Sequence, residues 1–190
     1  MKKQGLILLL FLVSCTKKSI DKNELASIQI IDRNGLSETI STEDKLKQFS
    51  NTDFHKPQPY QQVLQVFKQK EGKTPSKIFS YHPNGNLHQE LEIKNARANG
   101  LYKEYYPNGN IKIFAHVIGG PANFQSREEW IFNDRCTAWD EDGNKLSEFF
   151  YQDGFLNGNS FYYYPSGKIQ KVIPYKKHQI HGTVTTYFDN

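Results

Sequence analysis

Few side chains of this 190-residue chain stand in a spacing that supports catalysis or metal binding. His178 and His181 are three residues apart, a spacing that binds metal on a helix, but they precede Gly182 in a predicted turn. The run from Asp140 to Asn144 is similar to a calcium loop, yet its glycine comes two positions too early for an EF-hand. Acidic residues that could flank a glycosidic bond cannot be placed about 5 to 9 Å apart from sequence alone. We therefore expect no metal, no cofactor and no catalytic residue, so the predicted class is not an enzyme.

Of the two cysteines, Cys15 ends a segment with the features of an export signal. The chain starts with basic residues at positions 2 and 3, continues with the apolar residues 6–13 and ends this stretch with Ser14 before Cys15. Residues 6–13 are too few for a membrane-spanning helix, which takes about 20 residues. The segment 12–15, Leu-Val-Ser-Cys, resembles the lipobox of bacterial lipoproteins. The resemblance implies removal of residues 1–14 and a lipid on Cys15.

Lipid attachment predicts where the protein resides and what its other cysteine does. Acyl chains at Cys15 would anchor the protein to a membrane without a transmembrane segment. Thr16, rather than Asp, follows the cysteine, which resembles the default outer-membrane address of Gram-negative lipoproteins. Residues 15–27 are polar and predict a lipidated tether. Cys136 is then the one cysteine left for packing, since an intrachain disulfide needs two.

Charge and composition exclude some partners and favour one kind of secondary structure. Loss of Lys2 and Lys3 leaves 22 basic and 20 acidic residues, which lowers the formal net charge from +4 to +2. The sequence has no long Lys/Arg block and no acidic tail, so we expect no nucleic acid among its partners. Aromatic residues make up 14% of the chain, and such side chains favour β structure.

An aromatic residue followed by a glycine turn recurs along the chain. The segment Tyr-His-Pro-Asn-Gly-Asn at 81–86 returns as Tyr-Tyr-Pro-Asn-Gly-Asn at 105–110, 24 residues later, and as Tyr-Tyr-Pro-Ser-Gly-Lys at 163–168, with a degenerate copy at 139–143. The repeated turn glycines are Gly85, Gly109, Gly143 and Gly167. The repeated aromatic residues are Tyr81, Tyr105, Trp139, Tyr163 and, in a fifth copy, Tyr187. We interpret these rings as a structural seam, with a ligand-stacking groove as the alternative.

Residues at other fixed distances from the turn glycines also recur from copy to copy. Nine residues before the turn glycines stand Ser76, Gly100, Asp134, Gly158 and Gly182. Two residues after this second landmark stand mostly apolar residues, namely Ile78, Tyr102, Cys136, Ser160 and Val184. Two residues after the turn glycine stand Leu87, Ile111 and Ile169, with Leu146 displaced by one.

The repeat predicts a hairpin unit. Proline sets φ near about −65° and glycine accepts a positive φ, so Pro-Asn-Gly suits a tight turn between two strands. A second turn, such as Asn99-Gly100 or Asn157-Gly158, is expected to lead into the next unit. The predicted fold is therefore mainly β: an elongated single-layer antiparallel meander of tandem hairpin repeats over residues 76–190.

One interval between copies is longer than the others. From Gly100 to Asp134 the chain has ten extra residues, which we place at about 119–128. Insertions in repeat proteins map to loops, often on the binding face. The candidate partner contacts are Phe124, Arg127, Tyr102, Tyr106 and Tyr164. A harmless loop is the alternative, and deletion of residues 120–128 should spare folding if the segment is a contact element.

Residues 28–75 predict a small α+β cap before the repeats. A hairpin is expected around Asn34-Gly35, a short helix from an N-cap at 41–44 to Phe49, and a strand over 63–70 that turns at 71–73. We expect residues 28–60 to cover the first edge of the sheet, because an open edge strand invites aggregation.

The pattern Gly-x4-Tyr-Tyr-Pro-Asn-Gly-x-Ile over residues 76–190 resembles the MORN-variant repeats of bacterial proteins often labelled YwqK-type antitoxin components. The resemblance implies an elongated antiparallel sheet and a role in protein binding. This chain departs from the pattern at Asp134, at Glu141 and by the insertion.

The expected function is that of an exported lipoprotein, anchored to a membrane, which binds a protein partner or serves as a scaffold through its repeat sheet. One alternative is an immunity or antitoxin-like protein that neutralises an exported toxin. Another is a module that binds envelope glycan or lipid, for which Tyr102, Tyr106, Tyr162 and Tyr164 would have to be exposed.

Overall fold

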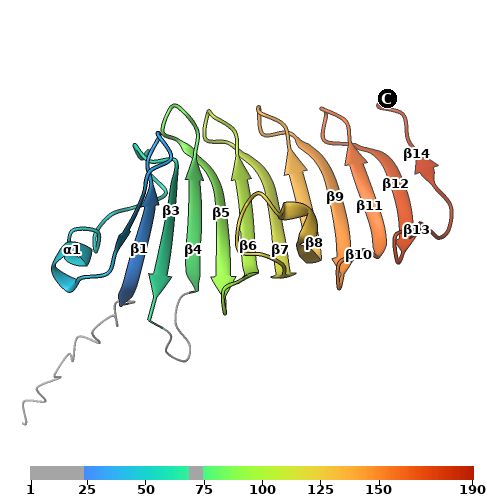
Figure 1. Cartoon of the computed structure of the whole chain (residues 1–190). Coiled ribbons are helices and arrows are strands. Elements are labelled where there is room, and N and C mark those ends of the chain that lie inside the picture. Colours follow the sequence, from blue (N-terminus) through green and yellow to red (C-terminus); the bar gives the residue numbers. More distant parts are fainter. Residues whose placement is uncertain (1–23, 69–74) are drawn as a thin grey trace, which may run out of the picture.

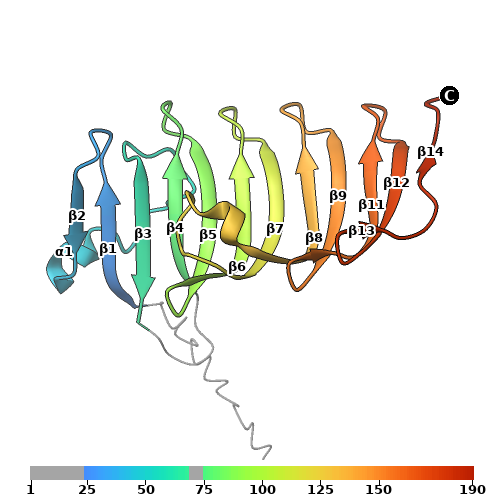
Figure 2. The same ribbon diagram turned by 45° about the vertical axis from the view of Figure 1, so that its right-hand side comes forward.

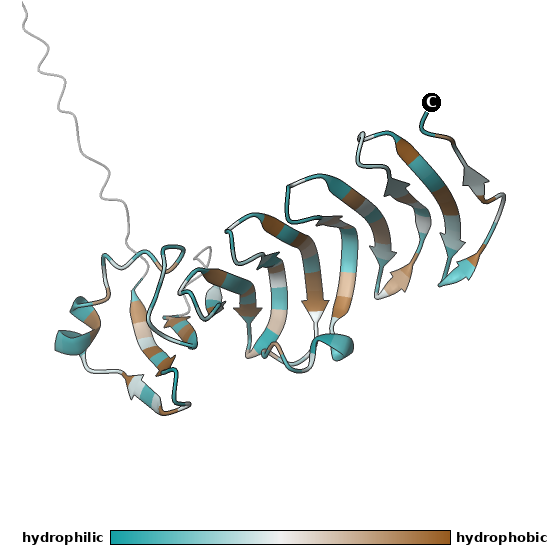
Figure 3. Ribbon diagram, turned by 90° about the horizontal axis from the view of Figure 1, so that it is seen from above, coloured by the Kyte–Doolittle hydropathy of each residue, from teal (hydrophilic) through white to brown (hydrophobic). Residues whose placement is uncertain are grey.

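In the computed structural model, residues 24–68 and 75–190 are described, and their strands form one antiparallel sheet (Figure 1). The order across the sheet is β2-β1-β3-β4-β5-β6-β7-β8-β9-β11-β12-β13, with β10 beside β9 and β14 beside β12. Seen from above, the strands form a single layer (Figure 3). The strands are β1 Leu25–Ile31, β2 Ser37–Ile40, β3 Gln62–Phe67, β4 Ser76–Tyr81, β5 Leu87–Lys94, β6 Arg97–Tyr105, β7 Ile111–Gly119, β8 Ile131–Trp139, β9 Lys145–Gln152, β10 Phe155–Leu156, β11 Gly158–Tyr163, β12 Ile169–Lys176, β13 Gln179–Ile180 and β14 Thr185–Thr186.

The mainly β, single-layer meander predicted from the repeats is therefore confirmed. Helical structure is limited to α1 (Glu43–Lys47) and the 3-10 turn η1 (Arg127–Glu129) in the described residues. Neither is long and apolar enough to span a membrane. The predicted signal, Cys15 and the predicted turn at 71–73 lie outside the described residues.

Every repeated hairpin closes with the same turn. At residues 82–86 the backbone N–H of His82 donates to the Asn86 carbonyl (2.8 Å) and that of Gly85 donates to the His82 carbonyl (2.9 Å). The same pair of bonds recurs at 106–110, 140–144 and 164–168. The four predicted turn glycines have φ values from +83° to +90°, which confirms their role. The hairpin between β1 and β2 uses the same turn, with Gly35 at φ +82°.

Each of these four hairpins also carries a bulge directly after its turn. The pairing shifts between Ser80 and Tyr81 in the first hairpin and at the equivalent place in the next three. The shift pairs the repeated aromatic residue of each hairpin with the residue two places after the turn glycine, and in the third hairpin that residue is Lys145. Lys145, not Leu146, is thus the counterpart of Ile111. Leu146 follows Lys145 in the shifted stretch and is 45% exposed.

The turns between units differ from those predicted. The chain reverses at Asn95-Ala96, Asp153-Gly154 and Lys177-His178, where the backbone φ values are positive. Gly100 and Gly158 instead lie in strands β6 and β11, with φ of +128° and +104°. Asp134 and Gly182, at the same repeat position, also have positive φ. The second landmark therefore marks a left-handed backbone position inside the sheet rather than a turn.

The two faces of the sheet carry separate cores. Face A is defined by the cross-strand row Val63, Phe79, Glu90, Lys103 and Phe114, and face B by the row Leu64, Ile78, Leu91, Tyr102 and Ala115. On face A, Phe79 and Tyr81 pack with Ile28, Leu46 and Phe54. On face B, Leu91 and Tyr102 pack with Ala98, Val117 and Trp130.

The N-terminal segment forms the predicted hairpin and short helix, and it meets the first edge of the repeats by adding strands to the sheet. Strands β3, β1 and β2 continue the sheet beyond β4, so the hydrogen-bonding groups on that side of β4 are satisfied by strand pairing. The short strand β2 becomes the edge. Helix α1, through the buried Leu46, and the loop with Phe54 pack on face A instead.

Candidate interaction surface

The repeated aromatic residues form a row on face A but not a continuous seam. Tyr81 is 4% exposed, Tyr105, Trp139 and Tyr163 are half-buried, and Tyr187 is 47% exposed. No two rings of this row stack on each other within the described residues. Equivalent residues lie two strands apart, about 9.5 Å, so the side chains of the intervening strand separate them. The predicted structural seam is therefore a row of separate rings on one face.

Successive turns are joined by side chains that donate to the backbone of the next unit. The residue after the repeated aromatic residue bonds to the carbonyl of the next aromatic residue: His82 Nε2 to Tyr105 O (2.9 Å), Tyr106 Oη to Trp139 O (3.0 Å) and Tyr164 Oη to Tyr187 O (2.9 Å). The tyrosine hydroxyls are therefore donors within the fold. Tyr106 and Tyr164, two of the candidate partner contacts, serve the contact between repeats.

Turn asparagines add a second set of links. Asn84 and Asn86 both donate through Nδ2 to Pro107 O, at 2.9 and 2.8 Å. Asn108 and Asn110 repeat the arrangement on Glu141 O, at 3.0 and 2.9 Å. In the third turn Asp140 stands at the position of His82 and Tyr106 and, as an acceptor, does not donate to the next unit. Its Oδ1 accepts from the backbone of Asp142 and Asn144, which accounts for the calcium-like run. We call these links between turns the turn ladder.

The insertion belongs to the segment 120–130 between β7 and β8, and from here the term insertion covers this whole segment. It lies on face B and is part of the core (Figure 2). Trp130 is 5% exposed, its ring lies 4.9 Å from that of Tyr102, and its Nε1 donates to Pro121 O at 2.8 Å. Phe124 packs against the same cluster. Tyr102 is 0% exposed beneath this cover. Tyr102 is thus wrong as a partner contact, and the insertion is a structural cover rather than a free loop.

A charged network holds the insertion to the sheet. Arg127 donates to Glu104 Oε2 at 2.8 Å, Tyr102 Oη donates to the same oxygen at 2.8 Å, and Lys112 donates to Oε1 at 2.7 Å. Burial alone would raise the pKa of Glu104, but these donors outweigh it and hold the pKa below its ordinary value. Arg127, predicted as a partner contact, is therefore engaged within the chain.

Two further buried carboxylates lie on face A. Glu90 accepts from Lys77 at 2.6 Å and lies 3.6 Å from Lys103 Nζ, and Glu148 accepts from Tyr163 Oη at 2.6 Å and Lys145 at 3.1 Å. Burial opposes ionisation, yet these partners lower the pKa of both carboxyls. All three glutamates are thus ionised groups that accept from donors within the chain. Within residues 24–68 and 75–190, no three acidic, His or Cys side chains gather as metal ligands.

Beyond β8, no described segment lies over either face of the sheet (Figure 2). Half-buried rings occur there on both faces, with Phe150 and Phe161 on face A. The half-buried residues Phe149 and Tyr151 on β9, Tyr162 on β11 and Tyr175 on β12 lie on face B, and we call them the open aromatic patch. Phe149 contacts Tyr162 with ring centroids 5.6 Å apart. The hydroxyls of Tyr151, Tyr162 and Tyr175 make no hydrogen bond to any described residue, unlike those of the turn ladder. Of these four residues, only Tyr162 was singled out by the sequence.

The patch lies beside the free cysteine. Cys136 pairs in register with Phe149 and packs against the face B core, and burial raises the pKa of its thiol. A buried thiol with a raised pKa is a packing residue, as predicted. Along β9 three aromatic residues follow one another, Phe149, Phe150 and Tyr151, so the sequence places rings on both faces and does not single out the patch.

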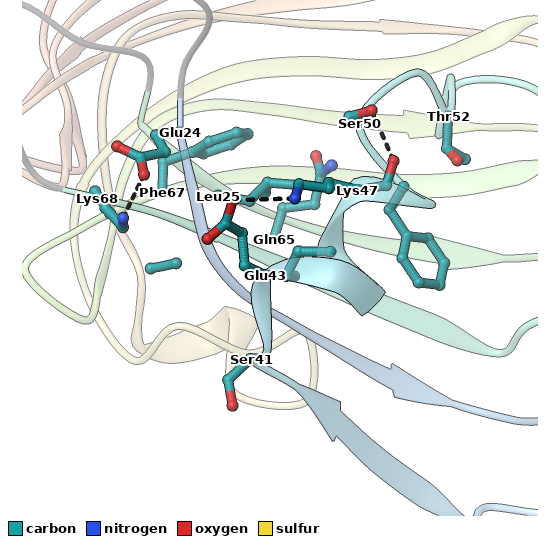
Figure 4. A pocket seen from close by; sticks show the side chains of 13 residues that line it. Glu24, Leu25, Ser41, Glu43, Lys47, Ser50, Thr52, Gln65, Phe67 and Lys68 are labelled. Atoms are coloured by element: carbon teal, nitrogen blue, oxygen red, sulfur yellow. Dashed lines mark hydrogen bonds and ion pairs between the residues drawn. The ribbon is translucent and has the colours of Figure 1, made fainter.

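A groove of about 550 Å³ lies at the other end of the molecule, between α1 and strands β1 and β3 (Figure 4). Its apolar lining includes Leu25, Leu46, Phe49 and Phe67. The charged groups at its rim pair with each other: Lys47 with Glu43 at 3.1 Å, and Lys68 with Glu24. The described part of the groove therefore offers an apolar wall whose charged neighbours are paired with each other.

The repeats match a known family. The family model of the MORN repeat variant matches residues 77–95, 98–113 and 156–177. The stretch with the insertion and the degenerate third turn lies between the matched segments. No curated protein and no solved structure matches the chain. The chain is therefore a repeat protein, and three of its segments are similar to the MORN repeat variant.

Proposed function

We propose that this chain is a membrane-anchored, non-catalytic protein-binding module and that the open aromatic patch is its contact surface. The observation that carries the proposal is the group of four half-buried rings on face B, three of which have hydroxyls that bond to no described residue, directly beside the segment that covers the same face. Uncovered apolar patches mark interaction sites in soluble proteins. Tyrosine is enriched at protein interfaces because its ring buries area while its hydroxyl tolerates water.

The anchor is proposed from the N-terminal sequence. The lipobox-like segment before Cys15 supports a lipid on that cysteine, and the polar residues after it support a tether leading to β1. A Cys15→Ser variant should move the protein from the membrane fraction to the soluble fraction of the producing cell. Retention of the variant in the membrane fraction contradicts the lipid anchor.

Protein binding is tested by site-specific photocrosslinking in the native envelope. A benzophenone side chain replaces Tyr162 on face B, and the matched control replaces Phe161, its neighbour on face A of the same strand. The expected result is a discrete crosslinked partner at position 162 that is absent at position 161. Equal crosslinking at both positions, or none at either, contradicts the assigned surface.

The geometry favours a protein over a glycan. Of the four tyrosines that a glycan-binding role requires, Tyr102 is buried and the hydroxyls of Tyr106 and Tyr164 are used within the fold. Only Tyr162 belongs to the open aromatic patch. Retention on isolated peptidoglycan that is lost in Tyr162→Ala would favour the glycan role instead. A toxin among the crosslinked partners would refine the proposal to an immunity protein.

A further inference from the structure

The insertion is an example of a polypeptide segment that packs on face B through two kinds of side-chain contact. Its Trp130 places a ring against the ring of Tyr102, and its Arg127 places a guanidinium against the carboxylate of Glu104. Two side chains three residues apart thus supply an aromatic contact and a charge contact. The sheet contributes the complementary ring and the complementary charge.

The same face continues from the covered part into the open part without interruption. Trp130 contacts Phe132 at 6.3 Å between ring centroids, and Phe132 contacts Tyr151 of the open aromatic patch at 5.6 Å. The patch therefore extends the surface on which the insertion already lies. A second peptide segment bound to the open aromatic patch would contact aromatic rings of face B, as the insertion does.

The charge at the open part has the opposite sign. Lys171 on β12 pairs in register with Tyr162 and so lies on face B beside the patch. Lys171 is half-buried and forms no ion pair with a described residue. In the covered part the sheet offers a carboxylate, Glu104; in the open part it offers an ammonium group.

We infer that the open aromatic patch binds an extended peptide segment of the partner that presents a large aromatic side chain close to a carboxylate. The aromatic side chain packs on Tyr162 and its neighbours, as Trp130 packs on Tyr102, and the carboxylate pairs with Lys171. This inference rests on the proposed protein-binding function and specifies the chemistry of the bound segment.

The test is selection from random 12-residue peptides displayed on phage against the purified full chain. Enriched peptides are expected to combine Trp, Phe or Tyr with Asp or Glu within a few positions. Tyr162→Ala should weaken binding of the enriched peptides about tenfold or more. Lys171→Glu should reverse the preference, so that a fresh selection enriches Lys or Arg beside the aromatic residue.

Matched controls lie on the opposite face of the same strands. Phe161→Ala on β11 and Lys176→Glu on β12 should leave the selected peptides and their affinities unchanged. Thermal unfolding of all four variants checks that each remains folded. The inference is overturned if the selected peptides lack an aromatic residue. It is also overturned if the Lys171→Glu variant selects peptides with the same charge preference as the native chain.

Two other outcomes separate this inference from the proposed function. In the first, a partner crosslinks at position 162 while the selected peptides show no preference for acidic residues. That result overturns the inferred peptide chemistry and still supports the proposed protein-binding function. A dimer in analytical ultracentrifugation that dissociates in Tyr162→Ala shows that the occupant is a second copy of the chain, which also overturns the inference.

Discussion

Strands β4 to β7 and strands β8 to β12 share one repeat but differ in what covers them. Both regions have the same hairpin turn, the same bulge after it and the same left-handed position in the preceding strand. The first region has the loop with Phe54 on face A and the insertion on face B, whereas the second has neither. The repeat therefore builds the backbone, and segments outside the repeat decide which faces remain available for binding.

The largest expected loss of stability comes from a substitution in the insertion that covers face B. Trp130→Ala removes a buried ring from the face B core and should lower the free energy of unfolding by about 3 to 5 kcal/mol. Tyr162→Ala, in the open region, should cost about 1 kcal/mol or less, because its ring is already partly in water. Urea denaturation followed by circular dichroism measures both. Equal losses would mean that the insertion adds no stability.

Two glycines at the same repeat position sharpen the comparison. A Cβ on Gly100 would lie 2.4 Å from Glu92 Oε2, whereas one on Gly158 would lie 3.6 Å from its nearest neighbour, Phe150 Cβ. Both positions have positive φ, so alanine is strained at each. Gly100→Ala should cost about 2 to 3 kcal/mol and Gly158→Ala about 1 kcal/mol. Similar thermal shifts in the two variants would show that backbone strain alone matters.

The network under the insertion should make stability depend on pH. The pKa of Glu104 lies below its ordinary value of 4.5 in the folded chain, so its contribution is present above that pH and is lost as the pH falls through the lowered value. Glu104→Gln should cost about 2 kcal/mol at pH 7, and the difference from the native chain should shrink below about pH 4.5. Glu148→Gln should cost less, because the Glu148 carboxylate is 12% exposed and that of Glu104 is 6% exposed. A pH-independent difference for Glu104→Gln would contradict the role of its charge.

The smallest effect concerns the turn ladder, which both regions share. Asn108→Ala removes the bond to Glu141 O and the acceptor for the Asn110 backbone, and should cost about 1 kcal/mol. In this variant, hydrogen exchange should be faster at the backbone amides of the neighbouring turn 140–144 as well as at the mutated turn 106–110. Faster exchange at the mutated turn alone would mean that neighbouring turns are not coupled.

Local residue chemistry was sufficient to predict the hairpins but not to predict which side chains lie at the surface. Pro-Asn-Gly sets the backbone angles of a turn through contacts within four residues, so the turn glycines and the antiparallel meander could be predicted. The place where the insertion lands depends on contacts between Trp130 and Tyr102, 28 positions apart in the chain, and no local preference encodes that pairing. Tyr102 was therefore expected at the surface and is fully buried.

The sequence by itself determined the period of the repeat, the turns that close its hairpins and the single-layer sheet, because these follow from short-range sterics and from alternation along a strand. Only the tertiary structure decided which face each tyrosine occupies, that Tyr106 and Tyr164 join neighbouring turns, and that Phe149, Tyr151, Tyr162 and Tyr175 remain open beside Lys171. The physical reason is that burial is a property of what packs above a side chain. In this protein the covering segments come from outside the repeat and reach only part of the sheet.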